Sequence, residues 1–209
     1  MKSLVFNGWA AGSETWELCT FPHDWVFDYI EQLDGLPEKV MDETDEAVLV
    51  GFSMGGSSAL RMTLKYPEKI RGLVLVSATP CMMEVKASGW RGMSERRLQA
   101  LKLGTQLVFR NDPSPIYRED NLDRGLDYLV KTDLRAALQA YRNTQPSQSF
   151  PVAVFQSERD GVVRPNNADF LKSIFPEARV TWVPGAEHVL PITVPELIDA
   201  AVRDILDRH

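Results

Sequence analysis

The sequence predicts an α/β protein built on a mostly parallel sheet. Short apolar runs alternate with stretches of helical periodicity, which is the pattern of strands connected by helices. One run, 48–50, leads into Gly51-Phe52-Ser53-Met54-Gly55, and a helical stretch follows at once. Between residues 80 and 147 only helical patterns remain. We therefore expect an α/β core formed by 1–79 and 148–209, with 80–147 inserted as a helical lid.

Length and composition fit a soluble domain with one insertion. The chain has 209 residues, 44% hydrophobic and 25% charged, and no apolar run is long enough to cross a membrane. The amino terminus enters a strand at once and lacks a signal-peptide pattern, so we expect a cytoplasmic protein. Cys19 and Cys81 stand outside disulfide and metal-ligand spacings. We expect neither a metal nor a cofactor.

The charge is unevenly distributed. A net charge of −6 argues against nucleic-acid or anionic-membrane binding. Residues 81–147 carry 11 Lys and Arg against 8 Asp and Glu, a local excess of +3. A solvated helical surface explains this excess as well as a docking surface does.

The elements before the lid follow from these patterns. Residues 4–6 are expected to form a strand. Apolar residues at helical spacing over 25–33 predict a helix with Asp24 as its N-cap, ended by Gly35 and Pro37. An acidic connector then leads into the strand before Ser53. The helix after Ser53 is expected to end at about Lys65, and the next strand covers 71–76.

The remaining elements are predicted in the same way. Three lid helices are expected around Leu98–Val108, Leu122–Val130 and Leu134–Tyr141. The core then resumes with strand 152–155, helix 166–175, strand 179–183 and helix 194–206.

The motif around Ser53 has the form of a nucleophile elbow. In Gly-x-Ser-x-Gly, the serine sits on a sharp turn between a strand and a helix. Side chains at Gly51 and Gly55 would collide with those two elements. Because a Gly/Ser-rich turn also occurs by chance, the hypothesis needs a base and an acid elsewhere in the chain.

Both groups follow in the required order. Asp160 comes just past the strand that begins at Val152, and His188 just past the strand that ends at Val183. Serine, acid and histidine, each after a strand, is the chain order of α/β-hydrolases. His188 would accept the Ser53 proton, while Asp160 would hold the imidazole in the correct tautomer.

Other residues compete for these roles. His209 is terminal, and His23 could be a cap or a surface residue. Glu158 lies closer to its strand than Asp160 and lacks the glycine that follows Asp160 in a turn-forming pair. Glu187 is expected to be exposed.

An oxyanion hole needs two backbone donors. One is expected to be the amide of Met54, which follows the nucleophile, and the other the amide of Trp9 in the loop after the first strand. A core position for the Trp9 ring is compatible with this role, because only the backbone is used.

Further segments of the sequence resemble one particular family among the α/β-hydrolases. They are Asn7-Gly8-Trp9, Ser77-Ala78-Thr79-Pro80-Cys81 with Trp90 and Gly92-Met93, Gly125-Leu126-Asp127-Tyr128-Leu129-Val130-Lys131-Thr132-Asp133-Leu134-Arg135, and Asp160-Gly161-Val162-Val163. With the elbow, they resemble the pimeloyl-[acyl-carrier protein] methyl ester esterase family of biotin synthesis. The resemblance fails between about Thr15 and Ala47, where the family carries an additional strand, so a smaller sheet is expected. Asn7 stands where the family usually has the histidine of its His-Gly oxyanion loop. A hydrogen bond of Asn7 is therefore expected to orient the loop after the first strand.

The resemblance implies a reaction and a partner. The reaction is hydrolysis of the methyl ester at the end of a pimeloyl chain on acyl carrier protein, an acidic protein that a basic lid would attract. Candidate contacts by charge are Arg91, Arg96, Arg97, Lys102 and Arg110. Candidate substrate-binding residues in an apolar acyl channel are Trp9, Met54, Trp90 and Phe109, although core packing is the commoner role of such side chains.

Other functions fit the same residues. A general short-chain carboxylesterase or thioesterase would need no carrier protein. A lyase of the menaquinone-pathway type would use the same triad without esterase activity, and some receptors keep this fold without catalysis. Serine at the apex argues against the aspartate-nucleophile dehalogenases and epoxide hydrolases.

Overall fold

A six-stranded parallel sheet forms the centre of the molecule. The computed structural model describes residues 1–81, 94–95, 97–99, 117–145 and 149–208. The strand order is β2-β1-β3-β4-β5-β6, and every neighbouring pair is parallel, so the predicted fold class is confirmed. The strands are β1 (Lys2–Phe6), β2 (Trp25–Phe27), β3 (Ala47–Phe52), β4 (Ile70–Val76), β5 (Val152–Ser157) and β6 (Arg179–Val183).

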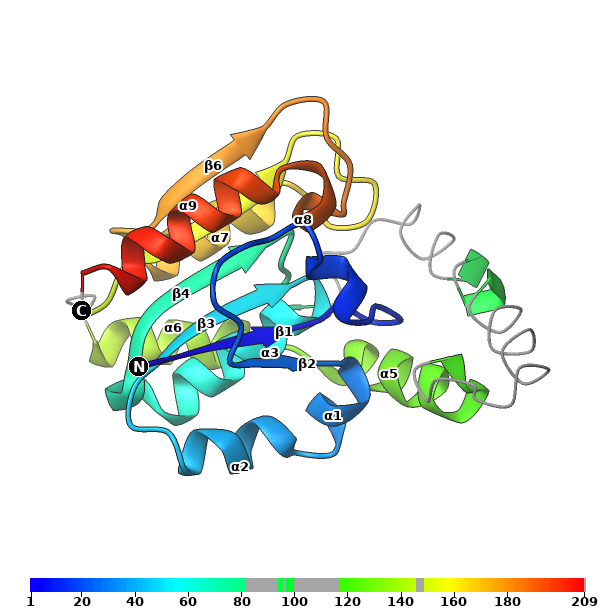
Figure 1. Ribbon diagram of the computed structural model, residues 1–209, viewed down its shortest axis with the longest axis horizontal. Helices are drawn as coiled ribbons and strands as arrows, with labels where there is room; N and C mark the ends of the chain where they lie inside the picture. Colours follow the sequence, from blue (N-terminus) through cyan, green and yellow to red (C-terminus); the bar gives the residue numbers. More distant parts are fainter. Residues whose placement is uncertain (82–93, 96, 100–116, 146–148, 209) are drawn as a thin grey trace.

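Helices cover both faces of this sheet (Figure 1). The helices with described bounds are η1 (Ser13–Trp16), α1 (Tyr29–Leu33), α2 (Leu36–Asp42), α3 (Met54–Lys65), η2 (Pro67–Lys69), α5 (Glu119–Lys131), α6 (Arg135–Thr144), α7 (Asn166–Ile174), α8 (Leu190–Thr193) and α9 (Pro195–Leu206). One core lies between the sheet and α2, α3, α6 and α7, and a second between the sheet and η1, α8 and α9. Leu49 of β3 belongs to the first core and Val48 and Val50 to the second. Burial on both faces explains why this strand reads as a continuous apolar run.

The helix expected over 25–33 is wrong in its first half. Residues 25–27 form β2, which pairs with β1, and the helix begins only at Tyr29. Asp28, rather than Asp24, is the N-cap: its side chain accepts from the amides of Ile30 and Glu31 in a complete capping box. Three apolar residues before the cap are too few to distinguish a strand from a helical face.

The stretch 15–47 therefore does contribute a strand, contrary to the expectation from the family resemblance. The structure also shows a helix that the sequence reading missed. Gly35, with φ of +77°, separates α1 from α2, and Pro37 lies in the first turn of α2. Pro37, expected only to end the preceding helix, therefore also lies at the start of the next one.

Two of the three helices expected in the lid region are described in full. α5 and α6 match the second and third expected helices, while the first is described only at 94–95 and 97–99, which are helical. Leu138 of α6 is fully buried in the first core. The lid boundaries at 80 and 147 stay a prediction.

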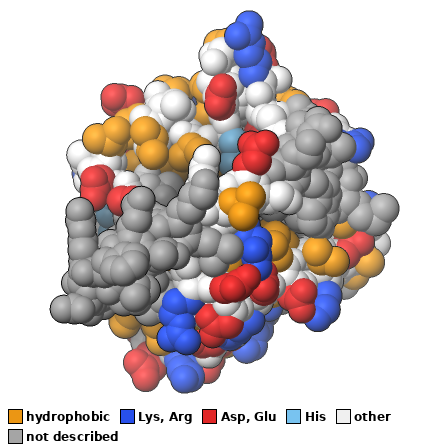
Figure 2. All heavy atoms as spheres, turned by 90° about the vertical axis from the view of Figure 1, so that its right-hand side faces the viewer, with side chains coloured by type: hydrophobic (Ala, Val, Ile, Leu, Met, Phe, Trp, Pro, Cys, Tyr) orange, Lys and Arg blue, Asp and Glu red, His pale blue; other side chains and the backbone are white. Residues whose placement is uncertain are grey.

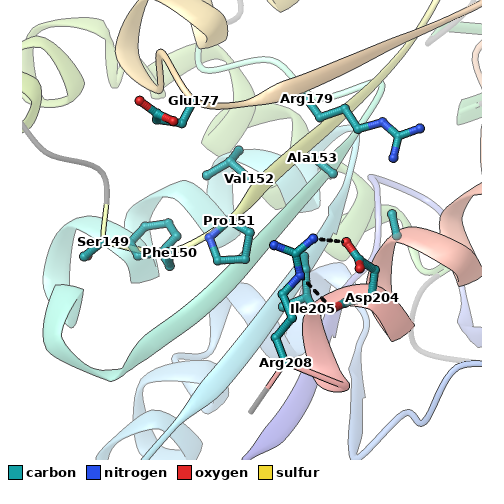
Figure 3. A pocket seen from close by; sticks show the side chains of 11 residues that line it. Ser149, Phe150, Pro151, Val152, Ala153, Glu177, Arg179, Asp204, Ile205 and Arg208 are labelled. Atoms are coloured by element: carbon teal, nitrogen blue, oxygen red, sulfur yellow. Dashed lines mark hydrogen bonds and ion pairs between the residues drawn. The ribbon is translucent and has the colours of Figure 1, made fainter.

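A hollow of about 450 Å³ lies at the amino-terminal end of β5, far along the sheet from the residues that follow the strands (Figure 3). Its charged lining includes Arg179 and an ion pair between Asp204 and Arg208.

Within the described ranges, no helix is long and apolar enough to span a membrane. Cys19 and Cys81 are buried and form no disulfide.

Replacing Gly55 with alanine should destabilise the fold. A Cβ at this position would lie 2.1 Å from the carbonyl oxygen of Phe6. Because this oxygen belongs to the backbone, it cannot move aside as a flexible side chain could. We expect the free energy of unfolding to fall by about 3 kcal/mol in urea titrations. The matched control is Gly161→Ala, because no described residue beyond its two chain neighbours has an atom within 4 Å of the added Cβ; a change within about 0.5 kcal/mol is expected there. Equal stability of the two variants would contradict this packing.

Candidate active site

The turn between β3 and α3 holds Ser53 in a strained backbone conformation. Ser53 has φ of +53° and ψ of −117°, a region that L-residues rarely adopt. Its amide donates to the carbonyl of Val76 at 3.0 Å, which ties the turn to the end of β4. A Cβ at Gly51 would lie 2.7 Å from the carbonyl oxygen of Gly55. The two glycines therefore permit the tight crossing of strand and helix that the sequence predicted.

Ser53, His188 and Asp160 form a continuous hydrogen-bonded chain. The Ser53 hydroxyl lies 3.0 Å from Nε2 of His188, and Nδ1 of the same ring lies 2.9 Å from Oδ2 of Asp160. Asp160 is fully buried, and the His188 side chain is 13% exposed. Because an ionised carboxylate only accepts, Nδ1 carries the proton and Nε2 is free to accept from the serine.

The surroundings of Asp160 keep it ionised. Oδ1 accepts from the amides of Val162 and Val163 at 2.8 and 2.9 Å, and Oδ2 accepts from Nε2 of Gln156 at 3.2 Å. Burial alone would raise the pKa of this carboxyl. The hydrogen bond and charge of His188, with the two amides, outweigh burial and lower the pKa below its ordinary value.

Two serine hydroxyls hold the loop that carries His188. Ser77, at the end of β4, donates to the carbonyl of His188 at 2.8 Å, and Ser157, at the end of β5, donates to the carbonyl of Ala186. Ser77 is fully buried and has φ of +45°. The ring of Phe52 packs at 5.2 Å, centroid to centroid, on the imidazole of His188. Residues from three strands thus fix the histidine.

The loop after β1 lies against the elbow. A Cβ on Gly8 would be 3.2 Å from Cβ of Ser53, which places this loop beside the serine. Asn7 orients it as expected: Oδ1 accepts from Nε1 of Trp16 at 2.7 Å, and the Asn7 amide donates to Phe27 at 3.0 Å. Figure 2 looks onto the end of the molecule towards which the strands of Figure 1 point.

The two predicted oxyanion amides are available for a ligand. Within the described part of the chain, neither the Trp9 nor the Met54 amide donates to a protein acceptor. Met54 is the first residue of α3, where helical amides have no partner inside the helix. The side chains of both residues are buried.

The residues that competed for the triad roles lie outside the hydrogen-bonded chain of Ser53, His188 and Asp160. Glu158 and Glu187 are exposed, and His23 packs on Phe21 at 4.2 Å between ring centroids. His209 lies outside the described residues, as do Trp90 and Phe109 of the expected acyl channel. The cations Arg91, Arg96, Lys102 and Arg110 fall in the same gaps. Arg97 is described and pairs with Glu119 and Asp123, both at 2.9 Å.

Sequence reasoning missed several supporting residues. Gln156 and Ser157 adjoin Asp160 in the sequence, and proximity alone could have suggested them. Ser77 and Trp16 carry no local signal for their contacts, because Ser77 reaches a residue 111 positions away. These contacts depend on how neighbouring strands end.

A comparison with protein families identifies the group to which this geometry belongs. The family model described as Serine aminopeptidase, S33, matches residues 22–192, well over half of the chain. The chain belongs to this α/β-hydrolase family. In this fold the strands are parallel, so the residues that follow them meet at one end of the sheet.

Two relatives with curated names cover most of the chain. A pimeloyl-[acyl-carrier protein] methyl ester esterase of Nitrosomonas europaea is 27% identical, over 80% of this chain and 74% of its own length. A protein of the same name from Yersinia enterocolitica is 29% identical, over 82% of this chain and 74% of its own. The resemblance found from the motifs is thereby confirmed.

Solved structures share the fold. A thermophilic esterase superposes with a TM-score of 0.66 at 20% identity, covering 99% of this chain and 90% of that one. A hydrolase from Oleispira antarctica gives 0.68 at 16% identity, covering 100% and 92%. At these identities the likeness concerns the α/β-hydrolase fold alone.

Replacing Asp160 with asparagine should produce a stability loss that depends on pH. The lowered pKa means that ionised Asp160 stabilises the folded state above the ordinary carboxyl pKa of about 4, and that this stabilisation is lost as the pH falls through the folded value. Urea unfolding at pH 7 should show Asp160→Asn less stable by roughly 2 kcal/mol. The gap should close below about pH 4. A gap that does not change between pH 7 and pH 3 would contradict an ionised, paired Asp160.

Removing the Ser77 hydroxyl should slow turnover without unfolding the protein. Ser77→Ala releases the His188 carbonyl, so the imidazole loses part of its alignment, and we expect kcat for an activated ester to fall about tenfold. Ser58→Ala is the matched control, since the Ser58 hydroxyl is also buried but has no hydrogen-bond partner among the described residues. Steady-state kinetics that show equal rates for both variants would refute the role of Ser77.

Proposed function

We propose that this chain is a serine carboxylic-ester hydrolase in which Ser53 is the nucleophile. The observation that carries the proposal is the hydrogen-bonded chain from Ser53 through His188 to Asp160, with separations of 3.0 and 2.9 Å. The strained backbone of Ser53 and the burial of Asp160 support it. Both features cost folding free energy, and in proteins such features cluster at active sites.

The first half of the reaction forms an acyl-enzyme. Oγ of Ser53 attacks the ester carbonyl carbon, and its proton passes to Nε2 of His188. The carbonyl oxygen becomes an oxyanion that accepts from the amides of Trp9 and Met54. His188 then gives its proton to the departing alkoxide, which leaves as the alcohol. Asp160 stabilises the imidazolium between these steps.

The second half returns the enzyme to its starting state. A water molecule gives a proton to His188 and attacks the acyl carbon, forming the same kind of oxyanion at Trp9 and Met54. The proton then returns to Ser53, and the carboxylic acid product departs. No cofactor takes part in this scheme.

The proposed substrate is the methyl ester of pimeloyl-acyl carrier protein, with cleavage in biotin synthesis. The names of the two curated relatives support it, as do the motif segments that suggested the resemblance. The side chains of Trp9 and Met54, with Trp90 and Phe109, are the proposed lining of the acyl channel. An acidic carrier protein would dock on the basic lid.

One observation favours the second candidate, a general short-chain carboxylesterase or thioesterase. Residues 117–145, the described stretch of the lid, hold five Lys and Arg and five Asp and Glu, so they carry no excess charge. Arg97 is neutralised by Glu119 and Asp123. Figure 2 shows both signs of charge intermixed on the visible part of this end. The basic excess lies wholly in the other lid residues.

Fluorophosphonate labelling tests the nucleophile. One equivalent should attach to Ser53, and Ser53→Ala should abolish labelling. His188→Ala should lower the rate constant for labelling and kcat by about 10³-fold or more, because the serine loses its base. A folded His188→Ala variant that keeps full turnover would disprove the mechanism.

Genetic complementation tests the substrate. Expression of this chain in a biotin-requiring strain that lacks its pimeloyl methyl ester esterase should restore growth without biotin. A Ser53→Ala version expressed at the same level is the control. Good expression without growth, together with rapid hydrolysis of free p-nitrophenyl esters by the purified protein, would favour the general carboxylesterase.

A further inference from the structure

The side chains of both proposed oxyanion residues belong to one buried cluster with residues of the helix α5. They belong to a small cluster of buried residues that is separate from the two main cores. Its buried members are Trp9, Ala10, Tyr29, Met54, Leu122 and Leu129. Figure 1 shows α5 beside α1, at the end of the sheet where the strands finish. A helix of the predicted lid therefore supports the loop and the turn that carry the two amides.

A direct hydrogen bond joins this helix to the loop. Nε1 of Trp9 donates to the carbonyl oxygen of Leu122 at 3.0 Å, across 113 residues of sequence. The contact is buried, and Trp9 is only 6% exposed. A buried indole N–H requires an acceptor. The position of α5 consequently sets the orientation of the Trp9 ring.

Gly125 permits the close approach of this ring. It lies three residues after Leu122, so both are on the same face of α5. A Cβ on Gly125 would lie 2.5 Å from Cδ1 of Trp9, 2.9 Å from its Nε1 and 3.0 Å from Cδ2 of Tyr29. Glycine weakens a helix interior, so its presence here has a packing reason. Any larger residue would push the indole away from α5.

The Trp9 amide is held between two fixed points. On one side Gly8 lies against Ser53, and on the other the Trp9 indole lies against α5. Ala10, the next residue, has φ of +53°, so the loop turns sharply at this place. Because the loop is fixed at both points, we expect a shift of α5 to displace the Trp9 amide.

We propose that α5 positions the oxyanion hole, with Gly125 and the Leu122 carbonyl as positioning groups that act through the Trp9 indole. The inference rests on the proposed function of the Trp9 and Met54 amides. Its consequence is that a displacement of α5 changes the stabilisation of the transition state. Such a change alters kcat rather than ground-state binding.

Two variants separate the parts of this link. Trp9→Phe keeps an aromatic ring but removes the donor to Leu122, and Gly125→Ala keeps the donor but displaces the ring. With a p-nitrophenyl ester, we expect kcat to fall about 10- to 100-fold in each, with KM within about threefold of the wild type. Asp127→Ala is the control: Asp127 is exposed on α5 and forms an ion pair with the exposed Lys131, so kinetics within about twofold are expected.

A trifluoromethyl ketone provides a readout that a merely structural defect would not move in parallel. Its carbonyl carbon bonds to Oγ of Ser53, the serine proton passes to His188, and the carbonyl oxygen becomes an alkoxide at the two amides. We expect its inhibition constant to rise in Trp9→Phe and Gly125→Ala by the same factor by which kcat/KM falls. Thermal melting identifies folded variants, and Trp9→Phe decides the matter should Gly125→Ala not fold.

Unchanged kcat in Trp9→Phe, or an effect confined to KM, overturns the proposal. So does a loss of kcat without a matching loss of ketone affinity. Failure of the proposed function gives a different result, since Ser53→Ala would then keep full turnover whatever happens at α5. Parallel losses in kcat/KM and ketone affinity, with a wild-type-like Asp127→Ala, support the link.

Discussion

The structure depends on the close approach of the first turn of α3 to the end of β1. At Gly55 the helix backbone lies so near the carbonyls of Phe6 and Asn7 that a Cβ would be 2.1 and 2.7 Å from their oxygens. This approach brings Ser53, at the start of the helix, beside the loop that follows β1. Every other part of the proposed site is arranged around that junction: the acid and the base follow β5 and β6, and the Met54 amide has no acceptor among the described residues.

The order of elements was predictable wherever the local pattern is long and unambiguous. The run through β3 and the glycines on either side of Ser53 identify strand, turn and helix from neighbouring residues alone, and α5 follows from its apolar spacing. The prediction failed at β2, because three apolar residues next to a helix have no period of their own. It placed the cap at Asp24 instead of Asp28 for the same reason. Pairing with β1 decides both, and pairing is not a local property.

The proposed site divides in the same way. Ser53, Asp160 and His188 were predictable because each follows a strand in a fixed order, and parallel strands bring their ends together. The residues that hold them were not, since Ser77 and Leu122 act through a hydroxyl or a carbonyl on partners more than a hundred positions away. Gly125 illustrates the difference: it was noticed as part of a motif, yet its contact with Trp9 exists only once α5 lies over the loop.

The central claim is that ester cleavage passes through a covalent acyl group on Ser53. The most direct measurement mixes the enzyme with p-nitrophenyl acetate, quenches it with acid during the first turnover and locates the added mass by peptide mass spectrometry. The account predicts one acetyl group on the peptide that contains Ser53, with its amount matching the burst of p-nitrophenol. A full burst with the acetyl group on another residue, or turnover with no acetylated Ser53 at any time, would contradict it.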